Sequence, residues 1–183
     1  MKNAPISLLA ACLALAIPAL AHAELSTGTR APQFVAKGAL GGKPFDVDLA
    51  RALKKGPVVL YFYPKAFTQG CTLEAHAFAE ATADFRAVGA TVIGMSADDL
   101  PTLRRFSEEA CRDKFAVASA TPAVIKAYDV DLAAKDGKST GLTKRTSYVI
   151  DRSGRIVFVH SDMNYAEHVR MTLAAVQGLK RKS

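Results

Sequence analysis

Apolar residues follow two different patterns along this chain. Residues 58–63 and 91–95 are short, continuous apolar runs rich in β-branched and aromatic side chains, which is typical of strands buried on both faces of a sheet. Over residues 71–88 the apolar positions instead recur mostly three or four apart, as on one face of a helix. Strands that alternate with helices in this way predict an α/β fold.

The remainder of the chain continues this alternation. Asp98 or Asp99 is expected to cap a helix that holds Pro101 in its first turn. Further strands and helices together predict a mixed central sheet with helices on both faces. The additional helices are predicted over residues 100–111, 122–128 and 165–179. A short strand is predicted over residues 115–118, and two further strands over 146–150 and 155–159 form a hairpin.

Two segments are better described by their turn-forming residues. Gly41-Gly42 lies in a Gly- and Pro-punctuated stretch before the first buried strand, and it predicts an N-terminal β-hairpin. Residues 131–144 are rich in Lys, Gly, Ser and Thr and show no apolar periodicity. We expect them to form a mobile surface loop.

The first 23 residues have a composition of their own. Lys2 is followed by an apolar stretch over residues 6–20 and then by Ala21-His22-Ala23, an A-x-A cleavage pattern. This predicts a secretory signal peptide over residues 1–23, cleaved after Ala23, and a single exported, periplasmic domain over residues 24–183. An alternative is a lipoprotein acylated at Cys12, but the apolar stretch continues well past that residue. No later apolar run approaches membrane length, so stable membrane insertion is not expected.

Composition and charge narrow the possible functions. The chain has 183 residues, 50% hydrophobic and 22% charged, which indicates a globular domain. Its net charge of +7 raises the question of nucleic-acid binding. Few basic residues are adjacent, and no aromatic side chains lie between them to stack on bases, so we interpret the charge as a solvated surface without nucleic-acid binding.

Cys71 is the candidate nucleophile. It follows the loop over residues 64–70 and comes at the start of the predicted helix. Unpaired backbone N–H groups and the helix dipole favour a negative charge at that position, and the thiolate is the nucleophilic form of cysteine. Gly70 leaves the approach to the sulfur free of a side chain. The alternative is that Cys71 is an inert, buried small residue.

The segment around Cys71 resembles the peroxiredoxins. Residues 61–74, YFYPKAFTQGCTLE, contain the Pro-x-x-x-Thr-x-x-Cys signature of that family. The flanking Phe-Tyr-Pro-Lys and Gly-Cys-Thr-x-Glu are similar to the bacterioferritin-comigratory, or Q-type, branch. Residues 31–34, 92–98 and 144–151 resemble other segments of the family. The resemblance implies a thioredoxin-like fold and a thiol-dependent peroxidase, an antioxidant oxidoreductase that needs no metal, haem or flavin cofactor.

The resemblance also assigns roles to individual residues. Cys71 would be the peroxidatic nucleophile, which attacks hydrogen peroxide or an organic hydroperoxide and becomes a sulfenic acid. Thr68 would hydrogen-bond the peroxide or the sulfur, and Arg145 would stabilise both the thiolate and the transition state. Pro64 would shield the sulfur from water and hold the loop.

The chain departs from the Q-type pattern in how the sulfenic acid is resolved. His76 occupies the position of the resolving cysteine of many members, and Gln69 replaces a usual proline. Other members resolve from the next long helix, so the resemblance favours Cys111 and a redox-active disulfide with Cys71. A permanent structural disulfide and a bystander Cys111 with an external resolving thiol remain alternatives. The expected reductant is thioredoxin-like or another dithiol, and the protein is expected to be a monomer or homodimer.

Other functions use the same residues differently. A disulfide oxidoreductase would need Cys-x-x-Cys, which is absent from the sequence. A periplasmic metal-binding module could combine Cys71 with His76, His160 or His168, although one cysteine with scattered histidines is a weak site for a soft metal. We interpret His160 and His168 as surface or hinge residues. A redox sensor of peroxide would share the chemistry of the peroxidase and differ only in its partner.

Overall fold

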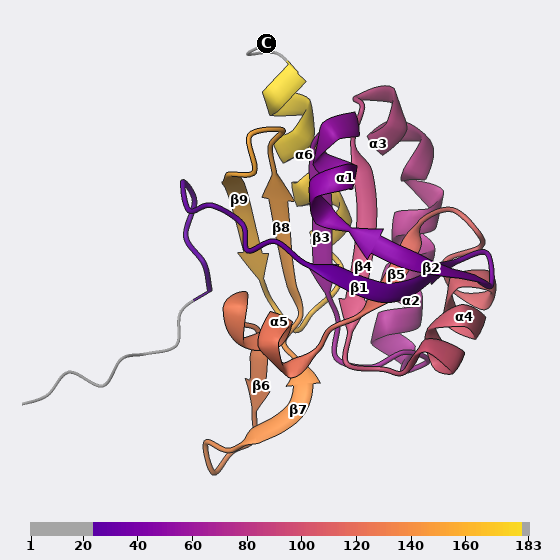
Figure 1. Cartoon of the computed structure of the whole chain (residues 1–183), viewed down its shortest axis with the longest axis vertical. Helices are drawn as coiled ribbons and strands as arrows, with labels where there is room; N and C mark the ends of the chain where they lie inside the picture. Colours follow the sequence, from indigo (N-terminus) through magenta and orange to yellow (C-terminus); the bar gives the residue numbers. More distant parts are fainter. Residues whose placement is uncertain (1–23, 181–183) are drawn as a thin grey trace, which may run out of the picture.

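The computed structural model describes residues 24–180, so the predicted signal peptide and Cys12, the residue of the lipoprotein alternative, lie outside the described residues. Seven strands form one mixed sheet, and they lie in the order β2-β1-β5-β4-β3-β8-β9 (Figure 1). In chain order these strands are β1 (Val35–Leu40), β2 (Lys43–Asp48), β3 (Val58–Phe62), β4 (Thr91–Ser96), β5 (Ala116–Ser119), β8 (Thr146–Ile150) and β9 (Ile156–Ser161). The predicted mixed sheet is confirmed.

The centre of the sheet is parallel and its outer strands are antiparallel. β3, β4 and β5 run in the same direction, whereas β8 runs antiparallel to β3 and β1 runs antiparallel to β5. All five residues of β3 are buried, as expected for a continuous apolar strand covered on both faces.

Helices cover both faces of the sheet (Figure 1). Residues of α1 (Leu49–Lys55) and the segment of α5 (Pro122–Ala127) pack into the apolar core on one face. The other face is covered by α2 (Gln69–Glu80), α3 (Thr82–Ala87), α4 (Leu100–Glu109) and α6 (His168–Lys180). Within residues 24–180, no helix is both long and apolar enough to cross a membrane.

The turn and cap residues identified in the sequence account for several boundaries. Leu40 pairs with Lys43 across Gly41 and Gly42, whose positive φ angles of 53° and 70° close the predicted N-terminal hairpin. Asp99, rather than Asp98, caps α4, because its carboxylate accepts the N–H of Thr102 at 2.9 Å.

Three sequence predictions differ from the structure. The helix predicted over residues 71–88 is two helices, which meet at Ala81, where the Thr82 hydroxyl donates to the carbonyl of Phe78. Residues 131–144 are not an irregular loop, because β6 (Asp131–Ala133) and β7 (Ser139–Thr143) form a separate antiparallel pair. The seven-residue α1 was not predicted.

Candidate active site

Cys71 lies in the first turn of α2, just beyond the end of β3. The helix begins at Gln69, with Thr68 as its N-cap, so Cys71 is inside the helix and does not open it as predicted. The cysteine is 2% exposed. Because the first N–H groups of a helix have no acceptor within it, this turn directs backbone donors and the positive end of the helix dipole toward the sulfur region.

Strand pairing brings Arg145 to the same place. Thr146, the first residue of β8, pairs with Phe62, the last residue of β3, because the two strands are antiparallel. Arg145 directly precedes β8 and therefore lies beside the loop that leads to Cys71. The Thr143 hydroxyl donates to the carbonyl of Tyr63 at 2.7 Å and joins the two loops.

The guanidinium group of Arg145 is held by three partners. Its Nη2 donates to Sγ of Cys71 at 3.3 Å, its Nε donates to the carbonyl of Met163 at 3.0 Å, and its Nη1 pairs with the carboxylate of Glu74. The side chain is buried. Burial lowers the pKa of Arg145, but the charges of Glu74 and Cys71 outweigh it and leave the pKa raised. The site therefore keeps a positive charge in a fixed orientation at the sulfur.

Glu74 is the residue that sequence reasoning left without a role. It lies one helical turn after Cys71, is fully buried, and binds Arg145 through Oε2, while Oε1 has no hydrogen-bond partner within residues 24–180. Burial raises the pKa of Glu74 to about 8, although Arg145 lowers it. The spacing of three from Cys71 within the family-like segment was the available signal. Glu74 positions Arg145 against the sulfur.

The loop before α2 is fixed from the end of β4. Oδ2 of Asp98 accepts both the backbone N–H of Ala66 and the hydroxyl of Ser96 at 2.7 Å. Phe67, one residue later, has a φ of 63°, which is unusual for a residue with a large side chain. The guanidinium of Arg105 lies 5.1 Å above its ring. These contacts give the loop one conformation.

The remaining predicted residues of the site lie in this loop. Thr68 is exposed, and its hydroxyl donates to the carbonyl of Lys65 at 3.0 Å, which leaves the oxygen lone pairs as acceptors. Pro64 is half-buried and directly follows Tyr63, whose N–H donates to the carbonyl of Met95. Gly70 makes room for the guanidinium, because a Cβ there would lie 3.4 Å from Nη2 of Arg145.

Comparison with known proteins agrees with this geometry. The sequence matches the AhpC/TSA family over residues 27–159. The chain belongs to the AhpC/TSA family. It is 33% identical to the chloroplastic Peroxiredoxin Q of Suaeda salsa over 158 residues, 86% of this chain and 70% of that protein. It is 28% identical to Peroxiredoxin Bcp of Bacillus subtilis over 159 residues, 86% of this chain and 99% of that protein.

A solved structure shows the same fold. The crystal structure of Peroxidoxin BcpB from Mycobacterium tuberculosis matches with a TM-score of 0.74 and 30% identity, and it covers 84% of this chain and 97% of that one. The predicted Q-type peroxiredoxin with a thioredoxin-like fold is therefore confirmed, and so is its class of activity, a thiol-dependent peroxidase.

Cys111, the predicted resolving residue of this peroxiredoxin, lies just after α4 and is fully buried. Cys71 and Cys111 are both free thiols and belong to the same apolar core. Burial raises the pKa of Cys111 far above its usual range. Its thiol is therefore neutral while the segment stays folded.

The histidines of the metal-binding alternative do not assemble with Cys71. His168 is fully buried and not a surface residue, because Ser147 and the carbonyl of Asp162 bind its two ring nitrogens. His160 packs against it with ring centroids 4.5 Å apart and is half-buried, so the surface interpretation was wrong for His168 alone. Among residues 24–180, no group of three or more His, Cys, Asp or Glu side chains is arranged to hold a metal ion.

Proposed function

We propose that this peroxiredoxin reduces hydrogen peroxide and organic hydroperoxides through Cys71. The contact between Nη2 of Arg145 and Sγ of Cys71 is the observation that supports this role. It places the positive guanidinium group beside the sulfur, which must be anionic to attack the peroxide. The position of Cys71 in the first turn of α2 adds the helix dipole to the same effect.

The first step of the reaction is the attack of Cys71 on the peroxide. The Cys71 thiolate attacks one oxygen of the peroxide, the O–O bond breaks, and the second oxygen leaves with the bonding electrons as an alkoxide or hydroxide. That oxygen takes a proton from solvent and departs as an alcohol or water. Cys71 is oxidised to a sulfenic acid and the peroxide is reduced.

Preorganised donors stabilise the charge that moves during this attack. Arg145 is held by Glu74 and Met163, so its guanidinium need not reorganise as charge shifts from sulfur to oxygen. In this proposal the Thr68 oxygen accepts a hydrogen bond from the peroxide, the N–H of Cys71 donates to the substrate, and Pro64 shields the sulfur. A preorganised donor such as the guanidinium of Arg145 is worth about 3 kcal/mol in a transition state.

Resolution by Cys111 is part of the proposal. The Cys111 thiol attacks the sulfenic sulfur of Cys71, and a disulfide forms with release of water. Cys71 and Cys111 belong to the same apolar core, which also contains Tyr61 and Tyr63. The two sulfurs thus lie in one buried region, and the first turn of α2 must unwind for them to bond.

The chain around Cys111 is suited to such local opening. Arg112 and Asp113 directly follow it, with φ angles of 50° and 57°. Left-handed backbone costs about 1–2 kcal/mol for each residue with a side chain. Two such residues in succession reduce the stability of this turn relative to an open conformation, which supports Cys111 rather than an external thiol as the resolving group.

The partners and location follow from the same proposal. A thioredoxin-like protein or another dithiol reduces the disulfide, and the protein works as a monomer or homodimer. Cleavage after Ala23 would deliver the protein to the periplasm. Reduction of its disulfide there requires a source of electrons that is itself exported. A relative from Suaeda salsa is chloroplastic by name, so a member of this branch acts outside the cytosol in that plant.

Peroxide consumption by site variants tests the proposal. Wild-type protein with a dithiol reductant should consume peroxide over many turnovers, and Cys71→Ser should consume none. Met163→Leu is the matched control, because Met163 contacts Arg145 only through its backbone carbonyl and its side chain is exposed. Full turnover by Cys71→Ser would refute the assignment.

A further inference from the structure

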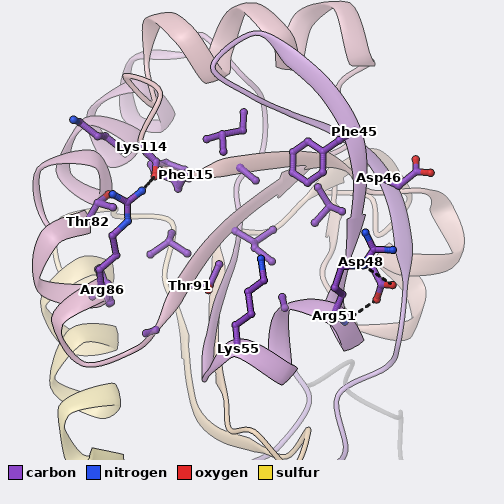
Figure 2. A pocket seen from close by; sticks show the side chains of 18 residues that line it. Phe45, Asp46, Asp48, Arg51, Lys55, Thr82, Arg86, Thr91, Lys114 and Phe115 are labelled. Atoms are coloured by element: carbon purple, nitrogen blue, oxygen red, sulfur yellow. Dashed lines mark hydrogen bonds and ion pairs between the residues drawn. The ribbon is translucent and has the colours of Figure 1, made fainter.

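A cavity of about 460 Å³ lies at the end of the sheet away from Cys71. It is bounded by the β1–β2 hairpin, α1, α3 and the starts of β4 and β5 (Figure 2). Cys71 follows the last residue of β3, whereas the cavity contacts Thr91, which pairs with the first residues of that parallel strand. A strand rises about 3.3 Å per residue, so the two places are separated by the length of the strand.

The cavity exists because the hairpin leaves the sheet early. β1 pairs with β5 at only two positions, Gly38 with Ala118 and Ala39 with Val117. Beyond Ala39 the hairpin diverges from β5, and the space between them is not filled by side chains.

Apolar side chains form the walls of this space. Residues from the cores on both faces of the sheet contribute, so the inside of the cavity offers little for water to bond. A volume of this size lies within the range of small-molecule sites, about 300–1,000 Å³. Leu40 and Phe45, which are 38% and 44% exposed, offer the accessible apolar surface. The buried apolar residues that also line the cavity are Val47, Phe85, Ala90, Val92, Ile93 and Phe115.

Cations outnumber carboxylates around the mouth. Four basic residues line the cavity, namely Arg51, Lys55, Arg86 and Lys114, against Asp46 and Asp48. Asp46 pairs with Lys37 at 2.7 Å, and Asp48 caps α1 and lies 3.9 Å from Nε of Arg51. Among the described residues, Lys55, Arg86 and Lys114 have no carboxylate within ion-pair distance, so the mouth presents a net positive charge.

Lys55 is the cation best placed to meet a ligand. Its side chain extends from the end of α1 toward the middle of the cavity (Figure 2). Within the described part of the chain, its ammonium has no hydrogen-bond or ion-pair partner. An apolar cavity that has the ammonium group of Lys55 at its mouth is complementary to a molecule with an apolar body and an anionic end.

We propose that this cavity binds a free, medium-chain organic carboxylate, with the apolar chain against Leu40 and Phe45 and the carboxylate on Lys55. The chain would replace water against apolar walls, and the ammonium would compensate the carboxylate as it leaves bulk solvent. The same arrangement excludes a cationic amphiphile. This site is independent of the peroxidase reaction, because none of Pro64, Thr68, Cys71 and Arg145 lines it.

Calorimetric titration of the full chain with three probes of equal chain length tests the proposal. Decanoate should bind saturably at one per chain, and decanol and decyltrimethylammonium at least about tenfold more weakly, the difference expected from one charged hydrogen bond. Amide NMR shifts caused by decanoate should centre on Val92 and Ala116. Equal affinity for decanol, no decanoate binding, or shifts that centre on Leu73 and Met163 beside Cys71 would overturn the proposal.

A matched pair of variants separates the site from general charge attraction. Lys55→Glu and Lys54→Glu change the net charge equally in adjacent exposed residues of α1, but Lys54 does not line the cavity. Decanoate affinity should fall at least about tenfold in Lys55→Glu and less than about twofold in Lys54→Glu. Equal losses in the two variants would overturn the proposal. Peroxide consumption is a separate readout, so failure here would leave the role of Cys71 intact.

Discussion

Nη2 of Arg145 lies 3.3 Å from Sγ of Cys71, although the two residues are 74 positions apart. The antiparallel pairing of β8 with β3 creates this contact, and Glu74 fixes it from the first turns of α2. The sulfur therefore meets a positive charge whose position is determined by the sheet and by the buried hydrogen bond between Arg145 and Glu74. Four predictions follow from this arrangement and its surroundings, with the rate, the stability and the recycling of the enzyme as readouts.

Replacing Arg145 by Lys should slow the reaction of Cys71 with peroxide by about 100-fold or more, the usual effect of losing one oriented donor. Lysine keeps the charge but cannot contact the sulfur, Glu74 and Met163 at once. Stopped-flow measurement of the reduced protein with hydrogen peroxide gives this rate. Arg170→Lys, in an exposed pair on α6, is the control and should stay within about twofold of wild type. An unchanged rate in Arg145→Lys would contradict the role of the guanidinium.

Glu74→Gln should alter how stability depends on pH. Burial raises the pKa of Glu74 from 4.5 to about 8, so between these values the folded protein holds a proton that the unfolded chain has released. This contribution is complete below pH 4.5 and is lost as pH rises toward 8. Wild type should therefore lose stability relative to the variant across this window, by up to about 1.4 kcal/mol per pH unit.

Urea unfolding of both proteins from pH 4.5 to 8 measures this difference. Glu80→Gln removes an exposed carboxylate from the same helix and should follow wild type at every pH. Parallel stability curves for wild type and Glu74→Gln would show that Glu74 does not bind its proton more tightly in the folded state.

His168 should produce a slope of the opposite sign at lower pH. Burial lowers the pKa of His168 from 6.5 to about 4, so the folded protein keeps the ring neutral while the unfolded chain protonates it. Its contribution to stability is present above pH 6.5 and lost as pH falls through 4. His168→Asn should be less stable than wild type at pH 7, and the gap should narrow toward pH 4. A gap of constant size in urea unfolding would exclude this titration.

Cys111→Ser should separate oxidation from recycling. Cys71 remains in place, so one equivalent of peroxide should still oxidise it at the wild-type rate. Without the buried thiol after α4 no intramolecular disulfide forms, and turnover with a dithiol carrier should stall after the first cycle. Peroxide consumption and a thermal melt, which checks that the variant is folded, are the measurements. Undiminished multiple turnover would remove Cys111 from the mechanism.

Much of the fold could be predicted because burial patterns are local. The continuous apolar runs that became β3 and β4 and the Gly41-Gly42 turn are each explicit in a few adjacent residues. The β6–β7 pair could not be predicted in the same way, because only Thr143 of its residues is buried and it is held by backbone pairing and by polar side chains such as Ser139, whose hydroxyl donates to Asp131. The interruption at Ala81 leaves the apolar spacing intact and gives no signal in the sequence.

The candidate site, too, could be predicted only where the signal lies in neighbouring residues. The sequence motif indicated Cys71, Thr68 and Arg145, and its spacing placed Glu74 one turn after Cys71, but it did not show that Glu74 would contact the guanidinium. That contact depends on β8 arriving beside β3, which no local pattern contains. His168 was interpreted as a surface or hinge residue because it lies early in a predicted helix. Its burial depends on Ser147, a hydrogen-bond partner 21 residues away.

Peptide mass spectrometry after one equivalent of hydrogen peroxide tests the central claim most directly. In Cys111→Ser treated with a sulfenic-acid trap, the adduct should be on Cys71. In wild type the peptides that contain Cys71 and Cys111 should be joined by a disulfide. A protein that consumes the peroxide while Cys71 remains an unmodified thiol would contradict the account.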